Sequence, residues 1–276
     1  MRELARLPLD VAAFAANYGP WAVIAGASEG TGACFAEELA AMGLNLVLVS
    51  RRPEALEALG ARLRAAHGIE TLTIAQDLSE PGAGQAIVAA CADRDVGLYI
   101  SNAGAGGFTH FLADDVAAAH RLVRMNISTL IDAAHGFGAR FLARGRGGIV
   151  VMASGAGLGG QPLLALYSAT KAFEINFAES LWAEYAERGI DAIAVAAPLM
   201  NTPMLQRTVA GMDFDLSRAF DPADVTHNAL AGLLAGEPLQ IIPDGPFAER
   251  LSQHAAERRE RLEAFTAFQK TFTGEA

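Results

Sequence analysis

Residues 21–32 read Trp21-Ala22-Val23-Ile24-Ala25-Gly26-Ala27-Ser28-Glu29-Gly30-Thr31-Gly32. A short apolar run is followed at once by a turn containing three glycines, and a helical pattern continues from Ala33. Glycines let the chain turn sharply and bring bare backbone N–H groups close to a phosphate at the N-terminus of a helix. The order of strand, glycine turn and helix therefore predicts a dinucleotide-binding turn. The simpler alternative is an ordinary strand-to-helix turn without a ligand.

Similar apolar runs recur along almost the whole chain, separated by longer helical patterns. Seven runs are expected to be strands: Trp21–Gly26, Asn45–Ser50, Thr71–Ala75, Leu98–Ser101, Ile149–Ala153, Ile190–Ala196 and Leu239–Ile242. The helical patterns include Ala33–Met42, Glu54–Ala66, Asp115–Leu142 and Thr170–Arg188. Strands that are apolar on both faces and alternate with helices indicate a parallel sheet covered on both sides. We expect one doubly wound α/β domain over residues 1–276, with about seven strands, a patternless substrate loop at about 198–222 and a charged helical tail at about 248–276.

Composition limits the possible partners and locations. The formal net charge of −10 argues against a nucleic-acid surface, and 52% hydrophobic residues argue against disorder. The N-terminus lacks the uninterrupted apolar core of a signal peptide, and no segment has the pattern of a membrane span. Cys34 and Cys91 are expected to be buried thiols rather than a disulfide, which favours the cytoplasm. No metal site is predicted.

The end of the second strand indicates which dinucleotide binds. In NAD-using folds an acidic residue near this point binds the ribose 2′-hydroxyl. This chain has Ser50-Arg51-Arg52 there, and two guanidinium groups suit a 2′-phosphate. The sequence therefore predicts NADP(H), although a solvated basic strand end would look the same.

A second cluster of polar residues follows the fifth strand. Tyr167 and Lys171 are four residues apart at the start of a helix and share one helical face. A phenol is a poor base at neutral pH, but a nearby ammonium favours the phenolate. Ser154, at the strand end, can donate to a substrate oxygen that develops negative charge. Taken singly, Ser154 could be a strand-end cap and Tyr167 a plain helix-face aromatic.

The Gly26-x-x-x-Gly30-x-Gly32 spacing together with Tyr167 and Lys171 resembles the short-chain dehydrogenase/reductase family. The resemblance spans Tyr18–Pro243, with Ala25 in place of the family's usual Thr. It implies a Rossmann-type fold and an oxidoreductase that transfers hydride between NADP(H) and a carbonyl/alcohol pair. Tyr18-Gly19-Pro20-Trp21 and Pro162-Leu163-Leu164 look most like the steroid and long-chain 3-ketoacyl reductase branch.

The resemblance also assigns roles to individual residues. Tyr167 is the general acid/base, Ser154 steadies the oxyanion, Lys171 tunes Tyr167 and holds the nicotinamide ribose, and Asn126 binds a water of the proton relay. Arg51 is assigned to the 2′-phosphate, with Arg52 stacking on adenine and Ser28 assisting. The remaining cofactor contacts that it implies are Gly26, Gly30, Thr31, Gly32, Asp77, Leu78, Asn102, Ala103, Gly104, Pro198 and Thr202. Leu199 replaces a family glycine, which puts the backbone there in doubt because Leu rarely adopts positive φ.

Three expectations complete the interpretation. The segments around the pocket are rich in apolar side chains, so an apolar small-molecule ketone or alcohol is expected. A four-spaced apolar stripe is formed by Phe173, Phe177, Leu181 and Tyr185. The resemblance links this stripe to a homodimer or homotetramer, whereas periodicity alone is more typical of plain core. The alternative function is a non-catalytic NADP(H)-binding regulatory protein, although such proteins usually lose the Tyr or the Lys.

Overall fold

The apolar runs form one parallel sheet. The computed structural model describes residues 1–276 except 107, 114, 243–247 and 274–276, so Pro243 and the last three residues of the expected tail lie outside the described residues. The strand order is β3-β2-β1-β4-β5-β6-β7, and every neighbouring pair is parallel. The strands are β1 (Trp21–Ala25), β2 (Asn45–Ser50), β3 (Thr71–Ala75), β4 (Val96–Ser101), β5 (Gly147–Met152), β6 (Ile190–Ala196) and β7 (Leu239–Ile241). The prediction of a seven-stranded parallel sheet is confirmed, and the order reverses between β1 and β4, where such folds bind ligands.

Helices connect the strands, and local sequence fixes several of their ends. They are α1 (Val11–Tyr18), α2 (Gly30–Ala41), α3 (Pro53–His67), α4 (Ala83–Ala90), α5 (Val116–Val123), α6 (Thr129–Arg144), α7 (Ala165–Tyr185), α8 (Pro203–Thr208), α9 (Pro222–Leu234) and α10 (Ala248–Thr273). Short turns are η1 (Phe111–Ala113), η2 (Arg124–Ser128), η3 (Gly155–Leu158), η4 (Ala186–Arg188) and η5 (Leu216–Arg218). Pro53 opens α3 and Gly68, at φ 70°, ends it. Asp221 caps α9 by accepting from the Ala223 N–H.

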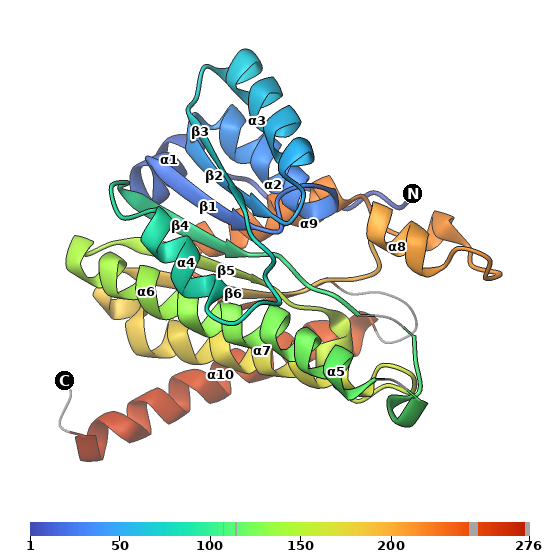
Figure 1. Cartoon of the computed structure of the whole chain (residues 1–276). Coiled ribbons are helices and arrows are strands. Elements are labelled where there is room, and N and C mark those ends of the chain that lie inside the picture. Colours follow the sequence, from blue (N-terminus) through green and yellow to red (C-terminus); the bar gives the residue numbers. More distant parts are fainter. Residues whose placement is uncertain (107, 114, 243–247, 274–276) are drawn as a thin grey trace.

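Helices cover both faces of the sheet, as Figure 1 shows. One core lies between the sheet and α1, α2, α3 and α9, and it includes Phe14, Phe35 and Leu230. The other lies between the sheet and α4, α6 and α7, and it includes Ile87, Phe137 and Ile175. Burial of these side chains is the main source of stability, and it holds the carboxyl ends of the strands at one common edge.

Three boundaries differ from the sequence prediction. The expected continuous helix Asp115–Leu142 is α5 and α6 joined by a π-helical turn, η2. The helix expected from Thr170 begins at Ala165, so Tyr167 lies inside its first turn. The loop at 198–222 is not patternless, because Thr202 caps the short helix α8.

The C-terminal helix is tied to the fold at its near end. Arg258 donates to the buried Glu179 of α7, and Arg259 donates to Glu237. The far end of α10 projects beyond the rest of the fold (Figure 1), and Phe265 and Phe268 are exposed there. Among the residues that the structure describes, no helix is long and apolar enough to cross a membrane.

The two cysteines are free thiols, as predicted. Cys91 is buried, but Cys34 is only half-buried, because it lies on the side of α2 that is partly open to solvent. Burial raises the pKa of the Cys34 thiol to about 11. Cys34 therefore stays a thiol at neutral pH.

Candidate functional site

The predicted acid–base pair lies at the start of α7. Tyr167 is half-buried, and the Lys171 Nζ lies 5.7 Å from the centre of its ring. The loop after β4 passes directly over that ring, since a Cβ added to Gly106 would lie 2.5 Å from a ring carbon. Just before the helix, Leu163 has φ 64°, a conformation that costs a non-glycine residue of order 1–3 kcal/mol. Such strain is typical of functional loops, and it lies four residues from Tyr167.

The two other predicted catalytic residues come from neighbouring elements: Ser154 follows β5, and Asn126 lies in η2 against the start of α7. Ser154 caps η3 by accepting from the Ala156 N–H at 3.2 Å, which leaves its own proton free to donate. Asn126 is buried, donates to Thr170 Oγ1 at 3.0 Å and accepts from the Ala105 N–H at 3.3 Å. A cap and a backbone-bonded amide are also the plain structural roles of these residues, so their catalytic roles stay predictions.

Lys171 has a partner that the sequence analysis missed. Its Nζ donates to both carboxylate oxygens of Glu174, at 2.7 and 3.1 Å, and to the Met152 carbonyl at 2.8 Å. Burial is the largest single influence and disfavours the Lys171 ammonium, but the Glu174 carboxylate and Tyr167 together outweigh it, so the pKa of Lys171 lies above its ordinary value. A charged residue on the inward face of a helix, between apolar neighbours, is the sequence signal that could have identified Glu174.

The glycine turn is tightly packed, and its glycines leave the backbone at the N-terminus of α2 uncovered by side chains of their own. A Cβ at Gly32 would lie 2.0 Å from the Gly26 carbonyl oxygen, and one at Gly26 would lie 2.8 Å from the Ala103 backbone. Glu29, the N-cap residue, makes no side-chain cap bond to the amides of α2 in the described structure. Thr31 donates to the Asn102 side chain at 2.6 Å. These features fit a pyrophosphate held by backbone N–H groups.

The two arginines after β2 behave differently from each other. Arg52 donates to Ser28 Oγ at 2.8 Å and pairs with Glu29 at 2.9 Å, so it lies over the glycine turn. Arg51 is exposed and lies near Asp77, whose pKa is lowered mainly by the hydrogen bonds it accepts from Ser79 and to a smaller extent by the Arg51 charge. The structure thus brings Arg52, rather than Arg51, together with Ser28.

Glu29 is a further residue that the sequence analysis did not single out. Its carboxylate also pairs with Arg207 of α8, and these two arginines lower its pKa. The pair connects the substrate loop to the phosphate turn.

The other predicted cofactor residues follow the strand ends at the same edge. Asp77 and Leu78 follow β3, and the Leu78 carbonyl accepts from Thr129. Asn102 also donates to the Gly26 carbonyl at 3.0 Å, which joins the loop after β4 to the glycine turn. A Cβ at Gly104 would lie 3.2 Å from the Lys171 Nζ.

The segment after β6 completes this edge. Pro198 comes two residues after the end of β6. Thr202 lies against Gly30, since a Cβ added to Gly30 would be 3.3 Å from the Thr202 side chain. Leu199 is not among the described residues with positive φ, so the doubt about its backbone is removed.

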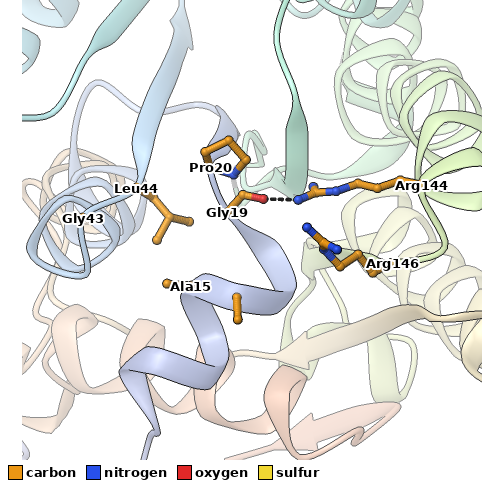
Figure 2. A pocket seen from close by; sticks show the side chains of 8 residues that line it. Ala15, Gly19, Pro20, Gly43, Leu44, Arg144 and Arg146 are labelled. Atoms are coloured by element: carbon orange, nitrogen blue, oxygen red, sulfur yellow. Dashed lines mark hydrogen bonds between the residues drawn. The ribbon is translucent and has the colours of Figure 1, made fainter.

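A cavity of about 380 Å³ lies at the opposite edge of the sheet, where the strands begin. Figure 2 shows Arg144 donating to the Gly19 carbonyl beside this cavity, with Arg146 close by. None of the predicted catalytic or cofactor residues lines it. The predicted site residues lie at the carboxyl edge, and this cavity is separate from them.

Comparisons with known proteins give consistent results. A family model described as short chain dehydrogenase matches residues 20–213. The 7beta-hydroxysteroid dehydrogenase of Clostridium sardiniense is 31% identical over 230 residues, which is 81% of this chain and 88% of that protein. The very-long-chain 3-oxoacyl-CoA reductase of Podospora anserina is 36% identical over 191 residues, 67% of this chain and 56% of that protein. The solved structure of a short-chain dehydrogenase from Sphingobium yanoikuyae in complex with NADPH has a TM-score of 0.79 and 31% identity, covering 89% of this chain and 96% of that one.

Proposed function

The chain belongs to the short-chain dehydrogenase family, and from that premise we propose that it is an NADP(H)-dependent oxidoreductase interconverting an apolar ketone and alcohol, with Tyr167 as general acid/base. The resemblance to the steroid and long-chain ketoacyl reductase branch is confirmed by the names of its relatives. One observation carries the proposal: Tyr167 and Lys171 share the start of α7 against the loop after β4, with the Lys171 Nζ 5.7 Å from the Tyr167 ring centre. A regulatory protein without turnover would not need this pair.

The residues at the carboxyl edge fit an NADP(H) molecule. The amides at the start of α2 would hold the pyrophosphate, and Asn102 keeps the loops around them in register. Arg51 and Arg52 would share the 2′-phosphate, with Ser28 beside Arg52. We propose a larger role for Arg52 than adenine stacking, because Ser28 and Glu29 hold it over the turn. The related Sphingobium enzyme was solved with NADPH, which supports this choice of cofactor.

Bound NADPH supplies the hydride for reduction. The chain's own residues manage the proton and the charge: Tyr167 protonates the carbonyl oxygen, and Ser154 donates a hydrogen bond to it as negative charge develops. Lys171 favours the phenolate that Tyr167 leaves behind. Asn126 fixes the loop after β4 against α7, where it would also hold a water that returns a proton. Oxidation of the alcohol runs the same steps in reverse.

Apolar side chains around the site support an apolar substrate. The loops that follow β4, β5 and β6 lie at this edge of the sheet, and the Thr109 N–H donates to the Leu163 carbonyl at 2.9 Å, which joins the first two. The exposed apolar side chains of these loops are Phe108, Phe111, Leu112, Leu163, Leu199, Met204 and Met212. Exposed apolar surface at a functional edge indicates a binding surface. The relatives' names, a hydroxysteroid dehydrogenase and a very-long-chain 3-oxoacyl-CoA reductase, point to large apolar substrates.

A substrate screen tests the proposal. Steroid ketones, long-chain ketones and small polar ketones are offered with NADPH and with NADH, and nicotinamide absorbance is followed. We expect turnover of the large apolar ketones with NADPH. NADPH binding without turnover of any carbonyl would favour the regulatory alternative, and turnover of the polar ketones alone would contradict the apolar substrate.

A further inference from the structure

A buried ion pair lies directly behind the acid–base pair. The side chains of Lys171 and Glu174 are 4% and 3% exposed, so water does not solvate either charge. The three N–H groups of the ammonium have three acceptors, namely two Glu174 oxygens and the Met152 carbonyl. Glu174 is the only one of these acceptors that has a charge. The charged state of Lys171 therefore depends on Glu174.

The cost of burial shows how strong that dependence is. A fully buried lysine without a partner can lose up to about 3–5 units of pKa, which would make it neutral near physiological pH. Burial likewise raises the pKa of Glu174 to about 7, and the Lys171 ammonium only partly opposes this rise. Each group is thus charged near neutral pH largely because the other is charged.

Few other groups can take over from Glu174. Among the described residues, the titratable ones that act on this pair are Tyr167 on α7 and Tyr99 on β4. Burial raises the pKa of Tyr99, so it stays neutral. From β5, the Met152 carbonyl accepts from Lys171, and Asn126 of η2 lies nearby across Gly104; neither group titrates. Within the described part of the chain, Glu174 is the one carboxylate that acts on Lys171.

We propose that Glu174 is a positioning residue for the reaction: it keeps the Lys171 ammonium charged and placed behind Tyr167, so that the phenolate forms at a lower pH. The proposal rests on the proposed function, because it concerns the residue that activates Tyr167. It extends the acid–base unit from two residues of α7 to three, at positions 167, 171 and 174. Glu174 acts through Lys171 and does not touch the substrate.

Glu174→Gln tests this role because it keeps the shape and removes the charge. Phenolate absorbance is titrated against pH in the cofactor-free protein, and subtraction of the Tyr167→Phe titration isolates Tyr167. At 5.7 Å and an effective dielectric constant of about 20 to 40, loss of the ammonium charge raises the midpoint of phenolate formation by about one to two pH units. We expect that rise in Glu174→Gln. In the plot of kcat/KM for alcohol oxidation against pH, the acid limb should move to higher pH by a similar amount.

Glu179→Gln is the matched control. Glu179 is also a buried carboxylate of α7 with a cationic partner, but its partner is Arg258 of α10. Glu179→Gln should lower stability without moving the phenolate midpoint. If Glu174→Gln does not fold, Glu174→Asp takes its place, since a shorter side chain loosens the pair and should give a smaller rise.

A midpoint that stays unchanged or falls in a folded Glu174 variant would overturn the proposal. Failure of the proposed function is a distinct result. In that case the wild type reduces no carbonyl or Tyr167→Phe keeps its turnover, while the absorbance titration still reports on Glu174.

Discussion

Lys171→Met removes the ammonium that we propose activates Tyr167. The Nζ lies 5.7 Å from the centre of the Tyr167 ring, within a site closed to water on the lysine side. Coulomb's law with an effective dielectric constant of about 20 gives about 3 kcal/mol for two unit charges at that distance. At 1.36 kcal/mol per pH unit, the phenolate should form about two units higher in the variant. Glu174 then protonates rather than staying charged and unpaired, because burial already raises its pKa to about 7.

The assay is kcat/KM for alcohol oxidation against pH, in wild type and variant. The acid limb should move to higher pH by about two units, since oxidation needs the phenolate. Lys171→Arg keeps the positive charge and should leave the limb near its wild-type position even if the rate falls. NADP(H) affinity, measured separately by fluorescence, should also weaken in Lys171→Met through the ribose contact. An acid limb that moves by less than about half a unit in Lys171→Met would refute the electrostatic reasoning.

Three further predictions concern the cofactor, the turn and assembly. Arg51→Ala and Arg52→Ala should each weaken the binding of NADPH much more than the binding of NADH, because only NADPH has the 2′-phosphate. Equal losses of affinity for both cofactors, or a wild-type preference for NADH in binding assays, would contradict the assignment. Gly32→Ala should abolish cofactor binding, because its Cβ would lie 2.0 Å from a carbonyl oxygen, whereas Gly159→Ala, with nothing within 4 Å, should bind normally by fluorescence titration. Light scattering at micromolar concentration should give a homodimer or homotetramer. A monomer would reject a role in assembly for the α7 stripe, which is Phe173, Phe177, Leu181 and Tyr185.

Much of the fold could be predicted from local patterns. The runs Asn45–Ser50 and Ile190–Ala196 are strands with the predicted bounds, because buried parallel strands have apolar residues on both faces. Thr71–Ala75 also has the predicted bounds, although it is the half-buried strand at the edge of the sheet. The glycine turn could also be predicted, because three glycines within seven residues permit its sharp backbone path. The π-helical turn at Asn126 was not, because it depends on contacts with Ala105 and Thr170, which are distant in sequence.

The side-chain partners within the site were harder to predict. Arg51 and Arg52 are adjacent and chemically alike, so only the fold shows that Arg52 reaches Ser28. Lys171 and Glu174 are three residues apart, but the sequence does not show that both point into the interior. The α7 stripe, where Phe173 and Phe177 stack at 5.5 Å, has a clear four-residue period and lies on a less buried face of the same helix. Burial, rather than spacing, identifies the ion pair.

Turnover and NADPH affinity of Tyr167→Phe test the central claim most directly. The variant removes one hydroxyl and leaves the ring that packs over Gly106. We predict that turnover of a ketone that the wild type reduces falls at least about a hundredfold, as expected for loss of a general acid, while NADPH binds almost as well as before. Near-wild-type turnover in this variant would contradict the account.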